Sequence, residues 1–155
     1  KNFAITFVDS TSSADDKKFI AYYNGKKWTY CTTKYANYTF TTYQKTLGRY
    51  QLMKDITCPK ISITKEINGK WISEQKDLKF IISDDLSGIK TYNGYLNGKW
   101  ILLEYESKTK TLKHSFLDGI VDEGKNDLKV IVTDNVGNST IFETQFFRSQ
   151  KTLNK

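Results

Sequence analysis

Several residue types are scarce in this chain, and each scarcity excludes a class of protein. The 155 residues include one histidine (His114), two cysteines and one proline. A catalytic zinc normally needs three ligands drawn mainly from histidine, cysteine and carboxylates, so a histidine-rich zinc site is excluded. No apolar run reaches roughly 18 residues, and no transmembrane segment is expected. Because G-x-S-x-G, G-x-G-x-x-G and Walker signatures are also missing, we predict that the chain is not an enzyme.

Positive charge is in excess, but arginine is not its source. Lysine and arginine together number 24 against 17 acidic residues, which gives a net charge of +7. Only Arg49 and Arg148 are arginines, whereas proteins that read nucleic acids usually rely on arginine for bidentate contacts. The lysines alternate with apolar residues, as on the wet face of a sheet. A solvated surface is favoured, attraction to an anionic polymer is the alternative, and no nucleic-acid partner is expected.

Apolar residues alternate with a period of two along most of the chain. Clear examples are residues 3–7, 78–82 and 128–132. Alternation of this kind is typical of strands with one face on a core and the other in water. A short helix is expected only at residues 13–19, with Ser12 or Ser13 as its cap. The sequence therefore predicts an all-β protein.

Three Asn-Gly pairs that are followed by lysine punctuate this pattern, and a tryptophan comes after each one. The pairs begin at Asn24, Asn68 and Asn97, and the tryptophans are Trp28, Trp71 and Trp100. Asn-Gly between β-prone residues predicts a hairpin, because a type I′ turn needs positive φ at both central positions. A fourth hairpin is predicted with its turn at residues 107–110, between strands over 102–106 and 111–116.

The tryptophans have two interpretations. Each indole can cover the end of a sandwich core or pack across strands on a tyrosine. Alternatively, Trp28, Trp71 and Trp100 are exposed platforms that stack on sugar rings, which makes them candidate ligand-binding residues. Exposure of two of them on one face would favour the second interpretation.

Two acidic, glycine-containing loops are expected at residues 83–89 and 133–138. In an immunoglobulin-like sandwich they would be the B–C and F–G loops, which lie at the same end. Their oxygen-bearing side chains could then converge on calcium, the only cofactor considered: Asp84, Asp85, Asp134, Asn135 and Asn138. The commoner explanation is local, because Asp and Asn side chains bond their own backbone in Asx turns.

The two cysteines, Cys31 and Cys58, leave a choice open. A disulfide between them would persist in an exported protein and would stabilise it by about 3–4 kcal/mol. Two reduced thiols explain the count equally well.

Several segments together resemble a known family. Residues 47–55 (LGRYQLMKD) and 58–61 (CPKI) resemble a junction in bacterial envelope proteins, in which a (F/L)G-x-(F/Y) strand precedes D-x-x-x-P-x-I. Residues 84–89 (DDLSGI), 92–100 (YNGYLNGKW), 133–138 (TDNVGN) and 146–148 (FFR) extend the similarity. The chain resembles the carboxy-terminal β-sandwich region of lysostaphin-type (LytM-like) zinc endopeptidases of Bacteroidetes-type bacteria.

The resemblance implies a domain organisation and a role. Residues 1–56 would form a small antiparallel β-region, residues 57–149 an immunoglobulin-like β-sandwich, and residues 150–155 a polar tail. The peptidase domain needs both an H-x-x-x-D and an H-x-H motif, and a chain whose single histidine is His114 cannot supply them together. We therefore expect an exported, non-catalytic accessory module, a processed chain or excised piece, that positions or spaces the catalytic domain of its parent protein. The alternative is a module that binds glycan or cell-wall polymer.

Overall fold

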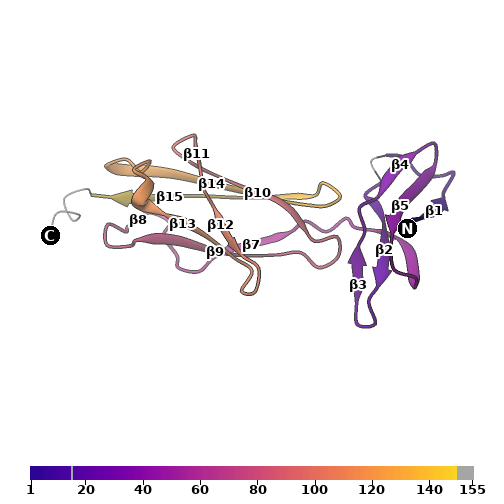
Figure 1. Ribbon diagram of the computed structural model, residues 1–155. Helices are drawn as coiled ribbons and strands as arrows, with labels where there is room; N and C mark the ends of the chain where they lie inside the picture. Colours follow the sequence, from indigo (N-terminus) through magenta and orange to yellow (C-terminus); the bar gives the residue numbers. More distant parts are fainter. Residues whose placement is uncertain (15, 150–155) are drawn as a thin grey trace.

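The computed structural model describes residues 1–14 and 16–149, which form two β-units joined end to end (Figure 1). The regular secondary structure in these ranges consists of β-strands, apart from one 3-10 turn, η1 (Phe116–Asp118). The all-β prediction is confirmed. The predicted polar tail, residues 150–155, lies outside the described residues.

The first unit contains two antiparallel sheets of three strands each, in the orders β1-β5-β4 and β3-β2-β6. Its strands are β1 (Phe3–Val8), β2 (Lys18–Tyr23), β3 (Trp28–Tyr30), β4 (Lys34–Ala36), β5 (Thr39–Gln44) and β6 (Arg49–Lys54). Phe19, Ile20 and Phe40 are buried and supply its small core. The Phe19 ring packs on Tyr30 with centroids 5.3 Å apart.

The helix expected at residues 13–19 is not formed, and that prediction is wrong. Ser13 and Asp16 bond each other in a single turn, with Ser13 N donating to Asp16 Oδ2 at 3.0 Å. Lys17 then adopts a left-handed φ of 55°, which breaks any continuation of a right-handed helix. The aromatic and β-branched run that follows pairs with β6 as strand β2.

The second unit is a sandwich of two sheets, and Figure 1 shows them as stacked layers. One sheet has the order β12-β13-β9-β7 and the other β11-β10-β14-β15-β8. The strands are β7 (Lys60–Ile63), β8 (Lys70–Trp71), β9 (Asp77–Ser83), β10 (Ile89–Leu96), β11 (Lys99–Ile101), β12 (Glu104–Glu106), β13 (Thr111–Ser115), β14 (Gly124–Asp134) and β15 (Ser139–Arg148). In immunoglobulin nomenclature this is A-B-E-D facing A′-G-F-C-C′, so the predicted sandwich is confirmed.

The core of the sandwich lies between the inward faces of these sheets. The alternation seen in the sequence determines which side chains enter it, because successive residues of a strand point to opposite faces. Leu78, Phe80 and Ile82 of β9 are buried, as are Val130 and Val132 of β14. The residues between them on each strand face outward.

Three of the four predicted hairpins are present: β2–β3, β10–β11 and β12–β13. Asn97 and Gly98 have φ values of 51° and 76°, as a type I′ turn requires. The hairpin predicted at Asn68 is wrong, since β8 runs parallel to β15 at the edge of the larger sheet. Gly69 N donates to Gln145 O at 2.9 Å, so this turn is held by a distant strand.

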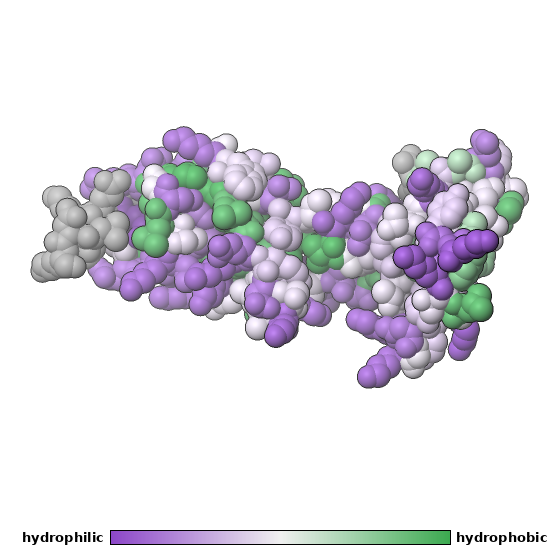
Figure 2. Space-filling model, viewed as in Figure 1, coloured by the Kyte–Doolittle hydropathy of each residue, from purple (hydrophilic) through white to green (hydrophobic). Residues whose placement is uncertain are grey.

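All strand pairs among the described residues form within one unit or the other. β6 ends at Lys54, and β7 begins at Lys60. Figure 2 shows a narrow waist between the units, with hydrophilic residues over much of the visible face and smaller apolar patches among them. Within the described residues, no helix has the length and hydropathy needed to cross a membrane.

Candidate functional site

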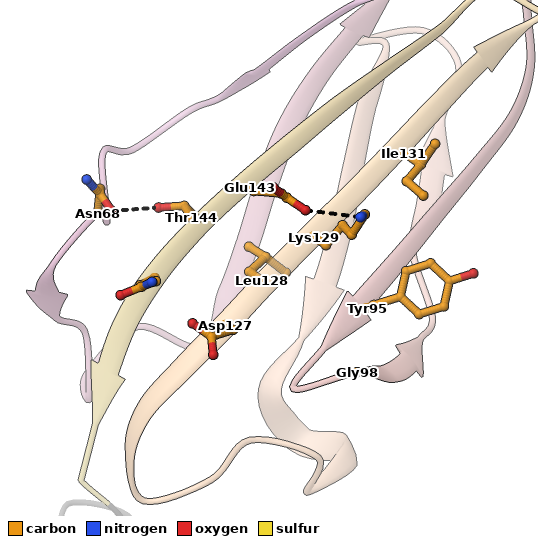
Figure 3. Close-up of a pocket in the computed structure, with 10 residues that line it drawn as sticks. Asn68, Tyr95, Gly98, Asp127, Leu128, Lys129, Ile131, Glu143 and Thr144 are labelled. Carbon is orange, nitrogen blue, oxygen red and sulfur yellow. Dashed lines mark hydrogen bonds and ion pairs between the residues drawn. The ribbon is translucent and has the colours of Figure 1, made fainter.

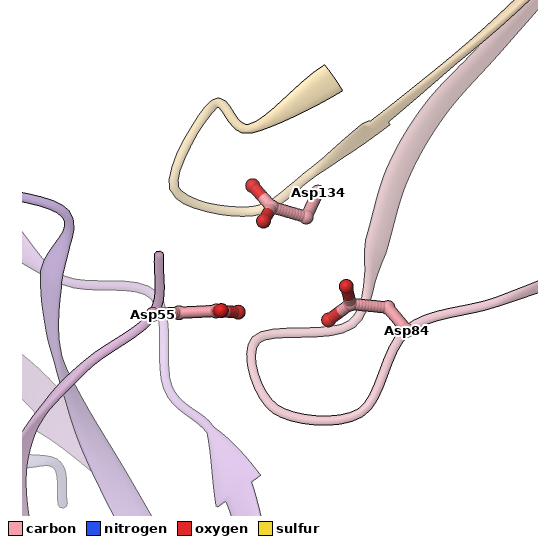
Figure 4. Close-up of side chains that lie close together, drawn as sticks. All are labelled: Asp55, Asp84 and Asp134. Atoms are coloured by element: carbon pink, nitrogen blue, oxygen red, sulfur yellow. The ribbon is translucent and has the colours of Figure 1, made fainter. Parts of the chain in front are cut away.

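Three carboxylates meet at the waist between the two units. Asp55 follows β6, Asp84 begins the B–C loop after β9, and Asp134 ends β14 before the F–G loop. One oxygen from each lies within 4.8 Å of the others. In Figure 4 the three side chains point toward a common centre from three separate segments. We call this group the carboxylate cluster.

Backbone N–H groups hold each carboxylate in place. Asp134 Oδ1 accepts bonds from the N–H of Val136 at 3.0 Å and of Asn138 at 2.8 Å, which is an Asx arrangement. Asp84 Oδ2 accepts a bond from Gly88 N at 2.7 Å. The predicted Asx turns therefore form, and they orient the same carboxylates that were candidate ligands.

Asp55 is held from both sides of the waist. Its Oδ1 accepts a bond from Thr57 N at 3.0 Å, and its Oδ2 accepts one from Ser87 N at 2.9 Å. The Asp55 side chain thereby joins the segment after β6 to the B–C loop.

Negative charge in the cluster has little compensation. Asp55 is 1 % exposed and Asp134 is 0 % exposed. In residues 1–14 and 16–149, no lysine, arginine or histidine nitrogen forms an ion pair within 4.0 Å of these carboxylates. Burial raises the pKa of Asp84 above its ordinary value, and the charges on Asp55 and Asp134 raise that pKa further. A bound cation or a retained proton would relieve this repulsion.

One oxygen of the cluster receives no hydrogen bond from the described residues. Asp84 Oδ1 is buried and has no hydrogen-bond partner among the described residues. A buried carboxylate oxygen without a partner is unfavourable in an apolar protein interior. Carboxylate oxygens are the ligands that calcium prefers, so the donor set fits a hard cation.

The other residues predicted as calcium ligands have different positions or contacts in the structure. Asp85 is exposed and lies outside the cluster. The Asn135 side chain donates to the carbonyls of Ser87 and Gly88, at 2.9 and 3.1 Å. Asn138 Nδ2 donates to Asp134 Oδ2 at 2.7 Å and to Asp55 O at 2.9 Å. Both asparagines hold the loops together through their amide nitrogens.

Asp55 was not predicted as part of the site. It does lie in the junction segment D-x-x-x-P, directly before the first strand of the sandwich. In this fold that strand starts at the end where the B–C and F–G loops meet, so its position could have indicated a third carboxylate.

Lys17 completes the connection between the units. Its carbonyl accepts a bond from Asp55 N at 3.0 Å. Its Nζ donates to Val136 O in the F–G loop at 3.0 Å. The connection between β1 and β2 is thus bonded both to the segment after β6 and to the sandwich.

The tryptophans fall into two groups. Trp28 is half-buried in the first unit, with its ring 5.3 Å from that of Tyr23. Trp71 is 65 % exposed and Trp100 is 56 % exposed. Trp71 is in register with Phe147, and Trp100 with Tyr95, on the outward face of the five-stranded sheet. Two indoles therefore lie exposed on one face, at its opposite edges.

Cys31 and Cys58 are both free thiols, so the disulfide left open by the sequence is not formed. Cys31 is buried in the first unit, where its N–H donates to Ile20 O at 3.0 Å. Cys58 is exposed beside the B–C loop, near Ser83 and Asp84. The fold places the two thiols in different surroundings, one inside a sheet unit and one at the waist.

Comparison with known proteins yields little at the level of sequence. No protein-family model matches the chain, and no curated protein matches it. Among solved structures, the chain is similar to fibronectin(III)-like modules of Clostridium thermocellum CbhA. The sequence identity is 15 %, the alignment covers 100 % of this chain and 89 % of that one, and the TM-score is 0.48.

Proposed function

We propose that this chain is a non-catalytic accessory module of an exported bacterial envelope protein, and that it sets the position of a neighbouring catalytic domain. The observation that carries the proposal is the bonded waist. Asp55, Lys17 and Asn138 connect the first unit to both loops at the near end of the sandwich. A spacer needs such a connection, because two units on a free linker would not transmit an orientation.

The resemblance described above supports the identity of the neighbour. It implies that the catalytic domain is a lysostaphin-type zinc endopeptidase within the same parent protein. The chain itself would set the distance and the angle between whatever is attached at its two ends. The first unit lies at one end, and β15 ends at the far end of the sandwich (Figure 1).

Rotational diffusion of the two units tests this role. NMR relaxation of backbone amides should give one common correlation time for the wild-type chain. The double variant Lys17→Met/Asn138→Ala should give two shorter times, while Lys45→Met, at an exposed site away from the waist, should behave as wild type. Independent tumbling of the units in the wild type would overturn the proposal.

We infer further that the carboxylate cluster binds calcium and that the ion stiffens the waist. The inference rests on three oxygen ligands without an ion-pair partner and on the unsatisfied Asp84 Oδ1. Calcium titrated into metal-free protein should release or absorb heat and raise the Tm, because a ligand that binds only the folded state stabilises it.

A matched pair of variants separates a specific site from general charge attraction. Asp84→Asn should abolish the calcium-dependent rise in Tm. Asp85→Asn removes the same charge from the adjacent, exposed position and should keep the rise. Equal responses in the two variants, or no response in the wild type at millimolar calcium, would rule out the site.

Glycan binding is a second candidate function, favoured by the exposure of Trp71 and Trp100 on one sheet face. Co-sedimentation with insoluble peptidoglycan and insoluble glycans, at low and moderate salt, tests it. Binding that survives salt and is lost in folded Trp71→Ala or Trp100→Ala would support this function. Trp28→Ala serves as the control, because Trp28 packs within the other unit. Binding that salt abolishes, with no effect of the tryptophans, would indicate only a basic surface.

A further inference from the structure

A groove of ≈ 860 Å³ runs across the outward face of the five-stranded sheet. This volume is within the range of small-molecule binding sites. Figure 3 shows its floor on β14 and β15, with Tyr95 of β10 on one side and Asn68, before β8, on the other. We call it the sheet-face groove.

Strand register places the two exposed indoles at the edges of this face. Tyr95 lines the groove and is paired with Trp100 on β11. Trp71 on β8 is paired with Phe147, two residues beyond the groove residue Gln145. The two tryptophan-bearing strands are four strand spacings apart, about 19 Å across the sheet. The sheet face between the two indoles is therefore wide enough for a chain of several sugar units, and Tyr95 supplies an aromatic ring within the groove itself.

The polar groups in the groove offer both donors and acceptors. Lys129 Nζ and Glu143 Oε1 form an ion pair of 3.0 Å on its floor, drawn as a dashed line in Figure 3. Asp127 contributes a carboxylate, and Gln145 and Asn68 contribute amides. Sugar hydroxyls suit such a set, because each hydroxyl can donate and accept at once.

The charge balance argues against other occupants. Each carboxylate of the groove is paired with a lysine, Glu143 with Lys129 at 3.0 Å and Asp127 with Lys125 at 3.2 Å, so an anionic polymer would find no net positive charge here despite the overall charge of +7. An apolar peptide segment would have to cover the Lys129–Glu143 pair, and burying charged groups carries a desolvation penalty. A neutral, hydroxyl-rich ligand needs no net charge in the groove and can hydrogen-bond to the paired groups.

We propose that the sheet-face groove binds a neutral oligosaccharide chain. The Tyr95 ring stacks on one sugar, Asp127 and Gln145 hydrogen-bond its hydroxyls, and Trp100 extends the aromatic platform along the chain. This assignment rests on the glycan-binding function proposed above and adds the class of glycan and the residues between the tryptophans.

NMR titration of the whole chain tests the assignment. The neutral probes are cellohexaose, chitohexaose, laminarihexaose and mannohexaose, and the anionic comparison is an oligogalacturonate of similar length. At least one neutral probe should shift the amide signals of residues 95, 127–129 and 143–145, and the oligogalacturonate should not. Gln145→Ala and Tyr95→Ala should each weaken binding at least tenfold, whereas Tyr43→Ala, an exposed tyrosine of the first unit, should leave it unchanged.

The possible outcomes separate this inference from the broader one. If glycans bind and Trp100→Ala abolishes binding while Gln145→Ala and Tyr95→Ala do not, the glycan-binding function stands and the groove assignment fails. Shifts with the oligogalacturonate alone would overturn the neutral class. If none of these probes shifts any signal at millimolar concentration and no insoluble glycan retains the chain, both proposals fail. Gln145 is exposed, so its variant remains informative even if Tyr95→Ala does not fold.

Discussion

The backbone N–H of Ser87 donates a 2.9 Å hydrogen bond to Asp55 Oδ2, although the residues are 32 positions apart. Both residues are 1 % exposed, so water does not compete for the bond. This contact ties the end of the first unit to the B–C loop and holds one carboxylate of the cluster toward the other two. The proposed positioning of the units and the proposed binding of calcium would therefore depend on the same side chain.

Asp55→Ala should destabilise the protein by about 1–3 kcal/mol in the absence of calcium, because Ser87 N and Thr57 N would lose their acceptor. Denaturant unfolding measures the change. Asp85→Ala is the control and should stay within about 0.5 kcal/mol of wild type, since Asp85 is exposed. Equal effects of the two substitutions would contradict the role given to Asp55.

The raised pKa of Asp84 predicts how stability changes with pH in metal-free protein. The pKa of Asp84 is higher in the folded protein than in the unfolded chain, where the pKa is near 3.8. Its contribution to stability is therefore fully present below that value and is lost as pH rises through the folded pKa. Asp84→Asn cannot titrate, so its stability relative to wild type should increase over this interval.

Thermal unfolding of wild type and Asp84→Asn in a chelating buffer, followed from about pH 3 to pH 7, measures this difference. A stability difference that is the same at every pH would show that Asp84 titrates normally. Calcium should reverse the trend for the wild type, because the ion competes with the proton for the same oxygens.

Features that depend on residues close together in the sequence could be predicted from the sequence. The alternation at 78–82 and 128–132 specifies the buried faces, and Asn97-Gly98 forms its turn with its own φ angles. Asn68-Gly69 has the same two residues, but its strand pairs with β15, which lies far along the chain. At residues 13–19, pairing of β2 with β6 replaced the expected helix. Both errors came from long-range pairing that overrides local preference.

The candidate site shows the same division. Asp84 and Asp134 could be placed together because immunoglobulin topology brings the B–C and F–G loops to one end. Asp55 joins them through contacts with Ser87 and Asn138, and in the sequence only its place directly before the first strand of the sandwich could have indicated this. Exposure of Trp71 and Trp100 likewise depends on which sheet face each strand presents, and a turn motif does not specify that.

Arg148 should be the more important of the two arginines for stability. Its guanidinium is buried over the Phe116 ring at 4.1 Å and donates to the carbonyls of Ile72, Ser73 and Gln75. Arg148→Met should cost about 3 kcal/mol, because these carbonyls lose their donor. Arg49→Met removes only a cation–π contact with Tyr23 and should cost less than about 1 kcal/mol in the same unfolding experiment. Similar losses would contradict this comparison.

Two glycines should respond to alanine for different reasons. At Gly94 a new Cβ would lie 2.9 Å from Ile101 Cγ1 and 3.0 Å from Leu103 Cδ1, so overpacking should cost about 1–3 kcal/mol. Gly98 has open space around it but a φ of 76°, so backbone strain of about 1 kcal/mol is expected. Urea unfolding gives both values. A smaller loss at Gly94 than at Gly98 would show that the β10–β11 edge yields more easily than the geometry indicates.

Thiol labelling distinguishes the two cysteines and tests the absence of a disulfide. Cys58 is exposed, whereas Cys31 is buried and burial raises the pKa of its thiol, so Cys31 is a poorer nucleophile. A maleimide should label the native chain once, and the label should disappear in Cys58→Ser. A second label should appear only under denaturing conditions and should be absent in Cys31→Ser. If protein that is purified and denatured without any reducing agent takes up no label, the two sulfurs are bonded and the free-thiol description is wrong.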